Sequence, residues 1–246
     1  MNTATLDKMR SMRLFGMLEA FDAMLKTAQT THYSTDELMA HLIEAEWNDR
    51  YNRRLDRLLK NARFRYAASL NEIDYQVPRG LDKGLIQRLS QGDFIRRAQN
   101  VIILGPTGVG KSFIATALGQ QACTLGMTTY YASTYKLFQE LKMAKADGSY
   151  PKILKRLAKQ ELLILDDFGI KPMDQHARMA LMEIMEDRHQ KQSTIITTQL
   201  PVKHWHETIG ESTIADAVMD RLVHSAHRID LKGESMRKIL SAKKEK

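Results

Sequence analysis

A glycine-rich segment, Gly105–Ser112, carries the residue types that bind phosphate groups. It reads Gly-Pro-Thr-Gly-Val-Gly-Lys-Ser and fits the phosphate-loop pattern G-x-x-x-x-G-K-[ST]. Glycines let the backbone turn tightly, so that its N–H groups form a concave anion site. Lys111 would reach the β- and γ-phosphates of ATP, and the Ser112 hydroxyl would coordinate Mg²⁺. The residues expected to contact the nucleotide are Gly105, Pro106, Thr107, Gly108, Val109, Gly110, Lys111, Ser112 and Phe113.

Two carboxylates follow an apolar run about fifty residues after Lys111. Leu162–Leu165 is uniformly apolar, and Asp166 and Asp167 come directly after it. A buried parallel strand presents its last side chains at the sheet edge where ligands bind. Asp166 would help to hold Mg²⁺ through water, and Asp167 would orient and deprotonate the attacking water. In the alternative interpretation, Asp167 is a surface turn residue.

Polar residues at two later positions could act on the γ-phosphate. Thr197, Thr198 and Gln199 end the next expected strand, and we place Thr198 in the catalytic set while the other two remain open. Alternatively, these residues satisfy their own turn before Pro201. Arg221 could act on the nucleotide of a neighbouring subunit as an arginine finger, or form an ordinary ion pair on a helix.

The elements around these residues alternate between strands and helices. An apolar run, 101–104, precedes the phosphate loop, and residues with helical spacing follow it. Further strands are expected at 128–132, 162–167 and 193–198. This alternation predicts an α/β fold, a parallel sheet with helices on both faces.

The chain before residue 66 predicts helices only. Apolar residues recur at three- and four-residue steps over 5–28, and a capping box at Ser34–Glu37 begins a second helix that should run to about Arg63. We therefore expect a small all-helical N-terminal domain at 1–66, a connector at 67–98, the ATPase domain at 99–240 and a basic tail at 241–246.

A basic stripe lies on the second of these helices. Its members follow i, i+3, i+4, i+7 spacing and are Arg50, Arg53, Arg54, Arg57 and Lys60. The net charge of +8 favours a polyanionic partner, most often nucleic acid. The stripe could bind a DNA backbone, or it could be a solvated helix face paired with Asp49 and Asp56.

Composition excludes several classes of protein. The single cysteine, Cys123, allows no internal disulfide and is expected to be a small core residue. The N-terminus lacks the apolar core of a signal peptide, and no apolar stretch approaches the ~20 residues of a membrane span. We therefore expect a cytoplasmic protein with no membrane partner.

Together these motifs resemble the IstB family, ATP-binding helper proteins of insertion-sequence transposition that are close to the DnaC and DnaA group of AAA+ ATPases. The resemblance covers roughly residues 5–240. The stretches that carry it are Gly105–Ser112, Leu162–Gly169, Ser193–Pro201 and Met219–Leu222. It implies a P-loop AAA+ ATPase that binds double-stranded DNA, assembles into a homo-oligomer with ATP at its interfaces and works with an IstA-like transposase. Hydrolysis of ATP to ADP and phosphate would reset the assembly.

The sequence departs from the wider AAA+ pattern in three places. One is the polar residue at the strand end, which is often Asn and is Thr197, Thr198 or Gln199 here. Many members carry Asp-Glu where this chain has Asp166 and Asp167, so Asp167 must lie closer to the water or act through a second one. Only 25 residues follow Arg221, too few for a full C-terminal lid, and Arg237 is a candidate for sensing nucleotide. The alternatives are a helicase loader of the same group, a small-molecule P-loop kinase and a non-enzymatic DNA-bending protein.

Overall fold

The computed structural model describes residues 2–27, 33–224 and 226–244. The chain divides into two compact units, one ending at Arg57 and one beginning at Leu58. The division falls within a single long helix, α3 (Thr35–Ala62), which agrees with the helix expected from residue 34 to about 63. It lies nine residues before the expected boundary at residue 66, because the last turn of α3 groups with the second unit.

The first unit contains α1 (Asn2–Ser11), α2 (Phe15–Thr27) and most of α3. We expected one helix over 5–28, but the chain breaks at Arg13, whose φ is +59°. The carboxylate of Glu46 on α3 accepts hydrogen bonds from the N–H groups of Gly16 and Met17, at 3.0 and 3.2 Å, and thereby caps α2. A Cβ on Gly16 would lie 2.3 Å from the Ala45 carbonyl oxygen, so only glycine allows this close approach.

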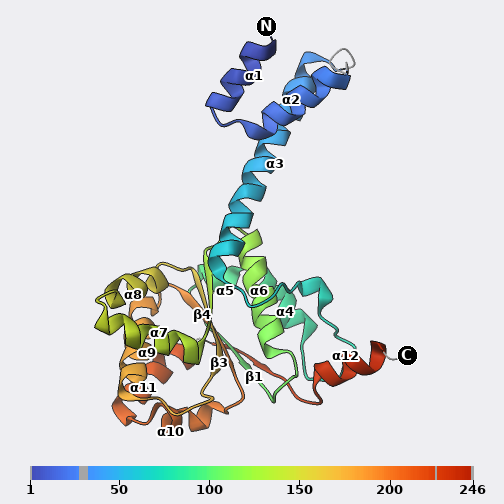
Figure 1. Ribbon diagram of the computed structural model, residues 1–246. Helices are drawn as coiled ribbons and strands as arrows, with labels where there is room; N and C mark the ends of the chain where they lie inside the picture. The colour runs from blue at the N-terminus through green and yellow to red at the C-terminus, as the bar shows by residue number, and fades with distance from the viewer. Residues whose placement is uncertain (1, 28–32, 225, 245–246) are drawn as a thin grey trace. The chain divides into compact units, whose positions relative to one another are not determined.

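The second unit is built on a five-stranded sheet with the order β2-β3-β4-β1-β5, in which every pairing is parallel (Figure 1). The strands are β1 (Val101–Leu104), β2 (Thr129–Ser133), β3 (Leu162–Phe168), β4 (Ser193–Thr198) and β5 (His227–Asp230). The helices are α4 (Lys83–Ser90), α5 (Asp93–Arg96), α6 (Lys111–Thr124), α7 (Thr134–Ala146), α8 (Tyr150–Ala158), α9 (Gln175–Arg188), α10 (Trp205–Ile209), α11 (Ser212–Val223) and α12 (Met236–Lys244). Short 3₁₀ turns lie at η2 (Leu70–Glu72) and η3 (Val202–His204).

Helices cover both faces of the sheet, as the strand–helix alternation predicted. Figure 1 shows α7 to α11 on one side and α4 to α6 on the other. Side chains along a strand alternate between the two faces. Ile102 and Leu163 therefore pack toward α7–α11, whereas Ile103 and Ile164 pack toward α4–α6. Cys123, on α6, is buried as expected.

The segment expected to be a connector, residues 67–98, is part of the second unit. Its apolar residues Ile73, Ile86 and Phe94 are buried in the same core cluster as β1 and α6. Local spacing predicts only a connector here, because it does not show the contacts of these residues with distant strands. Strand β5 was also not anticipated, because among its four residues only Ile229 is buried.

One helix, α12, follows β5 within the described residues. None of the helices in the described part of the chain is both long enough and apolar enough to span a membrane.

Candidate nucleotide site

The phosphate loop connects β1 to α6. Gly108 and Gly110 have φ values of +87° and +98°, a region that side chains other than glycine rarely adopt. Both glycines also lie against other segments. A Cβ on Gly108 would be 2.3 Å from the Ser235 Oγ, and one on Gly110 would be 2.6 Å from a guanidinium nitrogen of Arg79. The glycine spacing of the motif therefore has a steric reason in this chain.

Lys111 is the first residue of α6 and is only 5% exposed. Its Nζ donates a hydrogen bond to the Pro106 carbonyl at 2.9 Å, across the concave side of the loop. Burial lowers the pKa of Lys111, and the charges of Asp167 and Asp166 partly offset this. Gly110 is the N-cap of α6 and supplies no side-chain cap, so the first N–H groups of the helix are available to an anion. The loop, the ammonium and the helix end thus fit a triphosphate.

Asp166 and Asp167 lie at the carboxyl end of β3, where the register with β4 shifts between Leu165 and Phe168. Such an irregularity redirects side chains at the end of a strand. Asp166 is 1% exposed, and its carboxylate accepts hydrogen bonds from the Tyr131 hydroxyl at 2.5 Å and from the Thr197 hydroxyl. These two bonds fix the orientation of the carboxylate.

Asp167 has a φ of +60°, unusual for a residue other than glycine. Its N–H donates to the Thr197 Oγ1 at 3.0 Å. Burial and the neighbouring charge of Asp166 raise the pKa of Asp167, while the cations Lys111, Arg65 and Arg237 partly offset the increase. Asp167 and Lys111 therefore lie close enough for each charge to shift the pKa of the other. This is expected if the phosphate loop and the two carboxylates form one site.

The three polar residues after β4 have different surroundings. Thr197 is fully buried and bonded to Asp166. We placed Thr198 in the catalytic set, but its hydroxyl donates a hydrogen bond to the Phe168 backbone carbonyl at 2.8 Å. Gln199 accepts a hydrogen bond from the Thr107 Oγ1 at 2.7 Å and is the one of the three whose side chain contacts the phosphate loop.

Arg79 belongs to the site, and sequence reasoning missed it. It is 3% exposed, and its Nη1 donates to the Val109 carbonyl at 2.8 Å. The Arg79 carbonyl in turn accepts from the Lys232 N–H, and the Met236 N–H donates to the Gly108 carbonyl at 2.9 Å. Segments from before β1 and after β5 thus hold the loop. The only local signal was Pro-Arg-Gly, which indicates a turn.

Comparison with known proteins agrees with this site. The model of the family described as IstB-like ATP binding protein matches residues 7–244. The chain belongs to this family. It is 46% identical over 234 residues to an insertion-sequence ATP-binding protein of Sinorhizobium fredii, covering 95% of this chain and 96% of the relative. It is 31% identical over 216 residues to the IS21 ATP-binding protein of Pseudomonas aeruginosa, with coverage of 88% and 82%.

The fold of this IstB-family chain also resembles solved structures at lower identity. The DnaI structure has a TM-score of 0.56 at 22% identity, covering 67% of this chain and 90% of DnaI. The AMPPCP-bound DnaA of Aquifex aeolicus has a TM-score of 0.58 at 16% identity, covering 74% and 56%. These likenesses show that the fold of the chain resembles the folds of DnaI and DnaA, in agreement with the expected α/β fold.

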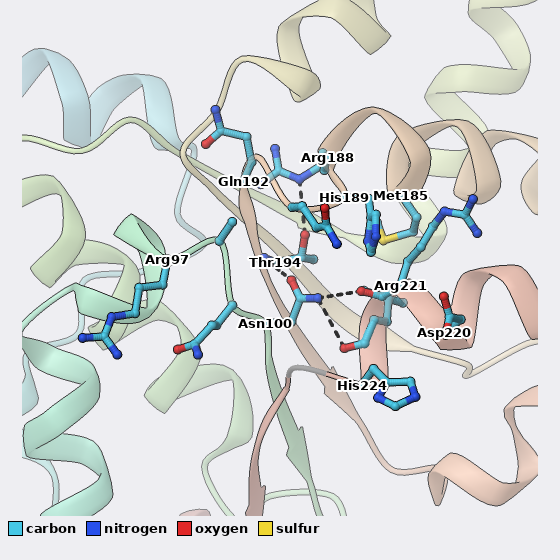
Figure 2. A pocket seen from close by; sticks show the side chains of 14 residues that line it. Arg97, Asn100, Met185, Arg188, His189, Gln192, Thr194, Asp220, Arg221 and His224 are labelled. Carbon is cyan, nitrogen blue, oxygen red and sulfur yellow. Dashed lines mark hydrogen bonds between the residues drawn. The ribbon is translucent and has the colours of Figure 1, made fainter.

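Arg221 of this IstB-family chain lies beside Asn100, at the end of the sheet where β1 begins (Figure 2). It is in the last turn of α11, beside a cavity of about 440 Å³. Its Nη2 pairs with the Glu186 carboxylate of α9. The side-chain amide of Asn100, just before β1, donates a hydrogen bond to the Arg221 carbonyl at 3.0 Å, so Arg221 lies near the start of this strand. The phosphate loop begins at the other end, after the last residue of β1. The length of β1, roughly 13 Å, separates them, so Arg221 is not brought to the nucleotide site of its own chain.

The basic stripe of this IstB-family chain is partly occupied by ion pairs. Arg50 bonds the Glu46 carboxylate at 2.6 Å, and Arg53 pairs with Asp49. Burial by itself would raise the pKa of Glu46, but the bonds from Arg50 and from the backbone outweigh it, and the pKa is lowered. Arg50 therefore supports the carboxylate that caps α2, and the Arg53 guanidinium also lies over the Phe15 ring of α2, 5.1 Å from its centroid. The exposed members beyond them toward the end of α3 are Arg54, Arg57 and Lys60.

Proposed function

We propose that this IstB-family chain is an ATP-hydrolysing helper of DNA transposition that assembles on double-stranded DNA and recruits or activates a partner transposase. The observation that carries the ATPase part is the shared environment of buried Lys111 and Asp166 and partly buried Asp167 beside a glycine-rich anion site. The names of the relatives, insertion-sequence ATP-binding proteins, support the transposition part.

The residues have separable roles in this proposal. Lys111 and the N–H groups of the loop bind the phosphates. The Ser112 hydroxyl coordinates Mg²⁺, with Asp166 held by Tyr131 to bind its water ligands. The metal would neutralise charge on the phosphates. Asp167 accepts the proton of the attacking water.

We assign the polar position after β4 to Gln199, because it contacts Thr107 of the phosphate loop. The buried Thr197 and Thr198 hydroxyls instead hold Asp166 and the backbone. Gln199 then orients the water or the γ-phosphate, and the two threonines fix the strand ends.

Arg221 completes the site of a neighbouring subunit in the ATP-bound oligomer. Its position near the start of β1, away from the phosphate loop at the other end of this strand, supports a role in the site of another chain. Its pairing with Glu186 must open for the guanidinium to reach a phosphate. ATP binding and assembly are therefore coupled in this proposal.

The test of the function is ATP turnover with and without long double-stranded DNA, with solution mass measured in parallel. We expect turnover that double-stranded DNA stimulates, and assembly that requires ATP. Stimulation by single strands alone would replace this proposal with a helicase loader. Turnover that no nucleic acid changes, in a monomer, would contradict both and favour a small-molecule kinase.

The basic stripe gives a prediction about DNA affinity. The Arg57→Ala/Lys60→Ala variant should bind double-stranded DNA more weakly, to a similar degree for unrelated sequences, because phosphate contacts carry no sequence information. The slope of log affinity against log salt should fall by up to about 1.8, roughly 0.9 for each lost phosphate contact.

The control for this prediction is Arg10→Ala/Lys26→Ala. It removes the same charge from α1 and α2, where Arg10 pairs with Asp7 and Lys26 pairs with Asp22. An unchanged salt slope in the stripe variant, or an equal change in the control, would exclude Arg57 and Lys60 from the DNA contact.

A further inference from the structure

Two consecutive tyrosines on β2, a strand at the edge of the sheet, point to opposite faces of it. Tyr130 is buried in the core cluster that β2 shares with α7 and α9, and Tyr131 is buried in the cluster that it shares with α4 and α6. Both tyrosines contact the segment that follows α3. The edge strand and this segment are therefore packed together within the second unit.

The first two residues after α3 contact one tyrosine each. The Arg63 guanidinium donates a hydrogen bond to the Tyr130 hydroxyl at 3.3 Å and lies 5.7 Å from the centroid of the Tyr130 ring. The Phe64 ring lies 6.4 Å from the Tyr131 ring, centroid to centroid, at an interplanar angle of 60°. Tilted aromatic pairs at this separation are favourable contacts. The segment therefore holds the edge strand from both faces of the sheet.

Phe64 also lies directly on α6, the helix that continues the phosphate loop. A Cβ on Gly119 would be 2.7 Å from Cε1 of Phe64, so a side chain at position 119 would displace the ring. The Tyr66 ring, two residues later, stacks on the Phe113 ring with the centroids 6.4 Å apart. The Phe64 ring is therefore placed between the second turn region of α6 and Tyr131, and it has little freedom to move without moving one of them.

Tyr131 connects this contact to the carboxylate that we assign to the water shell of Mg²⁺. The Tyr131 hydroxyl donates a hydrogen bond to Asp166 at 2.5 Å, and Asp166 is 1% exposed. A buried carboxylate oxygen that loses its donor is left unsatisfied, which costs more than the bond itself contributes. The position of the Tyr131 ring therefore fixes one oxygen of Asp166, and the Thr197 hydroxyl on β4 fixes the other.

We propose that Phe64 is a positioning residue of the Mg²⁺ site, which acts on the Asp166 carboxylate through the Tyr131 hydroxyl. The proposal rests on the proposed Mg²⁺-dependent ATP site and adds to it a residue that lies outside the phosphate loop and the Asp-Asp strand end. Because Phe64 follows the last turn of α3 almost directly, the orientation of the metal-site carboxylate depends on where this helix ends.

The first test measures how the affinity for ATP depends on the Mg²⁺ concentration, by isothermal titration of the full chain, which requires no hydrolysis. Tyr131→Phe removes the bond to Asp166 and should raise the Mg²⁺ requirement about 10–100-fold, the usual cost of losing a contact that orients a metal-binding group. Phe64→Leu keeps an apolar side chain but removes the ring, and should raise it roughly three- to tenfold. A Phe64→Leu chain with the Mg²⁺ requirement of the parent would overturn the proposal.

A double variant tests whether Phe64 acts through Tyr131. Phe64→Leu/Tyr131→Phe should need no more Mg²⁺ than Tyr131→Phe alone, whereas two effects that multiply would refute the path through the hydroxyl. Arg63→Met is the matched control, because it changes the neighbouring residue of the same segment, whose partner Tyr130 lies on the opposite face of the sheet. This control should keep the Mg²⁺ requirement of the parent. An equal rise in the control would mean a general disturbance of β2 and would also overturn the proposal.

A measurement without metal or nucleotide separates this proposal from the proposed function. The Tyr131 hydroxyl proton, bonded to a buried carboxylate, should give a downfield proton magnetic resonance that is absent from Tyr131→Phe. Phe64→Leu should shift or broaden this resonance, whereas Arg63→Met should not, and thermal unfolding checks that each variant is folded. These changes in a chain that binds no ATP would support the path from Phe64 to Asp166 and contradict the proposed function. A resonance that Phe64→Leu leaves unchanged, in a chain that hydrolyses ATP, would contradict the positioning role alone.

Discussion

Replacing Lys111 with alanine is expected to abolish ATP binding at micromolar nucleotide. Lys111 is buried at the start of α6, and its Nζ lies across the phosphate loop on the Pro106 carbonyl. A charged hydrogen bond to phosphate at a buried position is worth about 2–5 kcal/mol, so the dissociation constant should rise roughly thirtyfold to several thousandfold. Isothermal titration with ATP and with ADP measures both constants.

The reason for a large effect is that no other cation of the loop can replace the ammonium. Burial already lowers the pKa of Lys111, and the charges of Asp167 and Asp166 partly offset this by favouring the ammonium form. Lys142→Ala serves as the control, because Lys142 pairs with Asp174 at the surface and its loss removes the same charge. Thermal unfolding of both variants would show whether the fold is intact. A Lys111→Ala protein that binds ATP within threefold of the parent would contradict the assignment of the loop.

The phosphate loop could be predicted from the sequence because its physics is local. Three glycines, a lysine and a hydroxyl at fixed spacing already define the turn and the helix end. The parallel sheet could also be predicted from the sequence, since uniformly apolar strands such as Leu162–Leu165 are characteristic of parallel sheets. The fold class and the family resemblance are confirmed.

The contacts that hold the loop could not be predicted, because they join segments far apart in the sequence. Arg79 reaches Val109 across thirty residues, and Thr107 reaches Gln199 across 92. The structural reason for Gly16 is also non-local, because the Ala45 carbonyl oxygen lies 2.3 Å from where a Cβ would be. The sequence also could not show which of Thr197, Thr198 and Gln199 contacts the phosphate loop, because this depends on the hydrogen-bond partners of their side chains.

The backbone at Asp167 is the strongest structural argument for its chemical role. A left-handed φ at an aspartate, next to a register shift in β3, is costly and persists only where the surroundings enforce it. The enforcing contact is the bond from its N–H to Thr197, which also orients Asp166. Thr197 therefore orients the carboxylate of Asp166 but holds only the backbone of Asp167.

Asp167→Asn is accordingly expected to bind ATP with nearly the affinity of the parent but to lose turnover by about 10²–10⁴, the usual contribution of a general base. Asparagine is the suitable replacement because it tolerates a left-handed backbone and keeps the shape of the side chain. Single-turnover hydrolysis of bound ATP measures the chemical step, and gel filtration with DNA should show assemblies that persist.

A comparison of Asp166→Asn with Asp167→Asn tests which of the two carboxylates is the general base. The Asp166 carboxylate accepts bonds from Tyr131 and Thr197 and is assigned to the water shell of Mg²⁺, so Asp166→Asn should need more Mg²⁺ for the same turnover. Asp167→Asn should leave the Mg²⁺ requirement unchanged, because the metal does not depend on the base. If raising Mg²⁺ restored turnover to Asp167→Asn, Asp167 would be a metal-binding residue, and the proton acceptor would have to be sought elsewhere in the site.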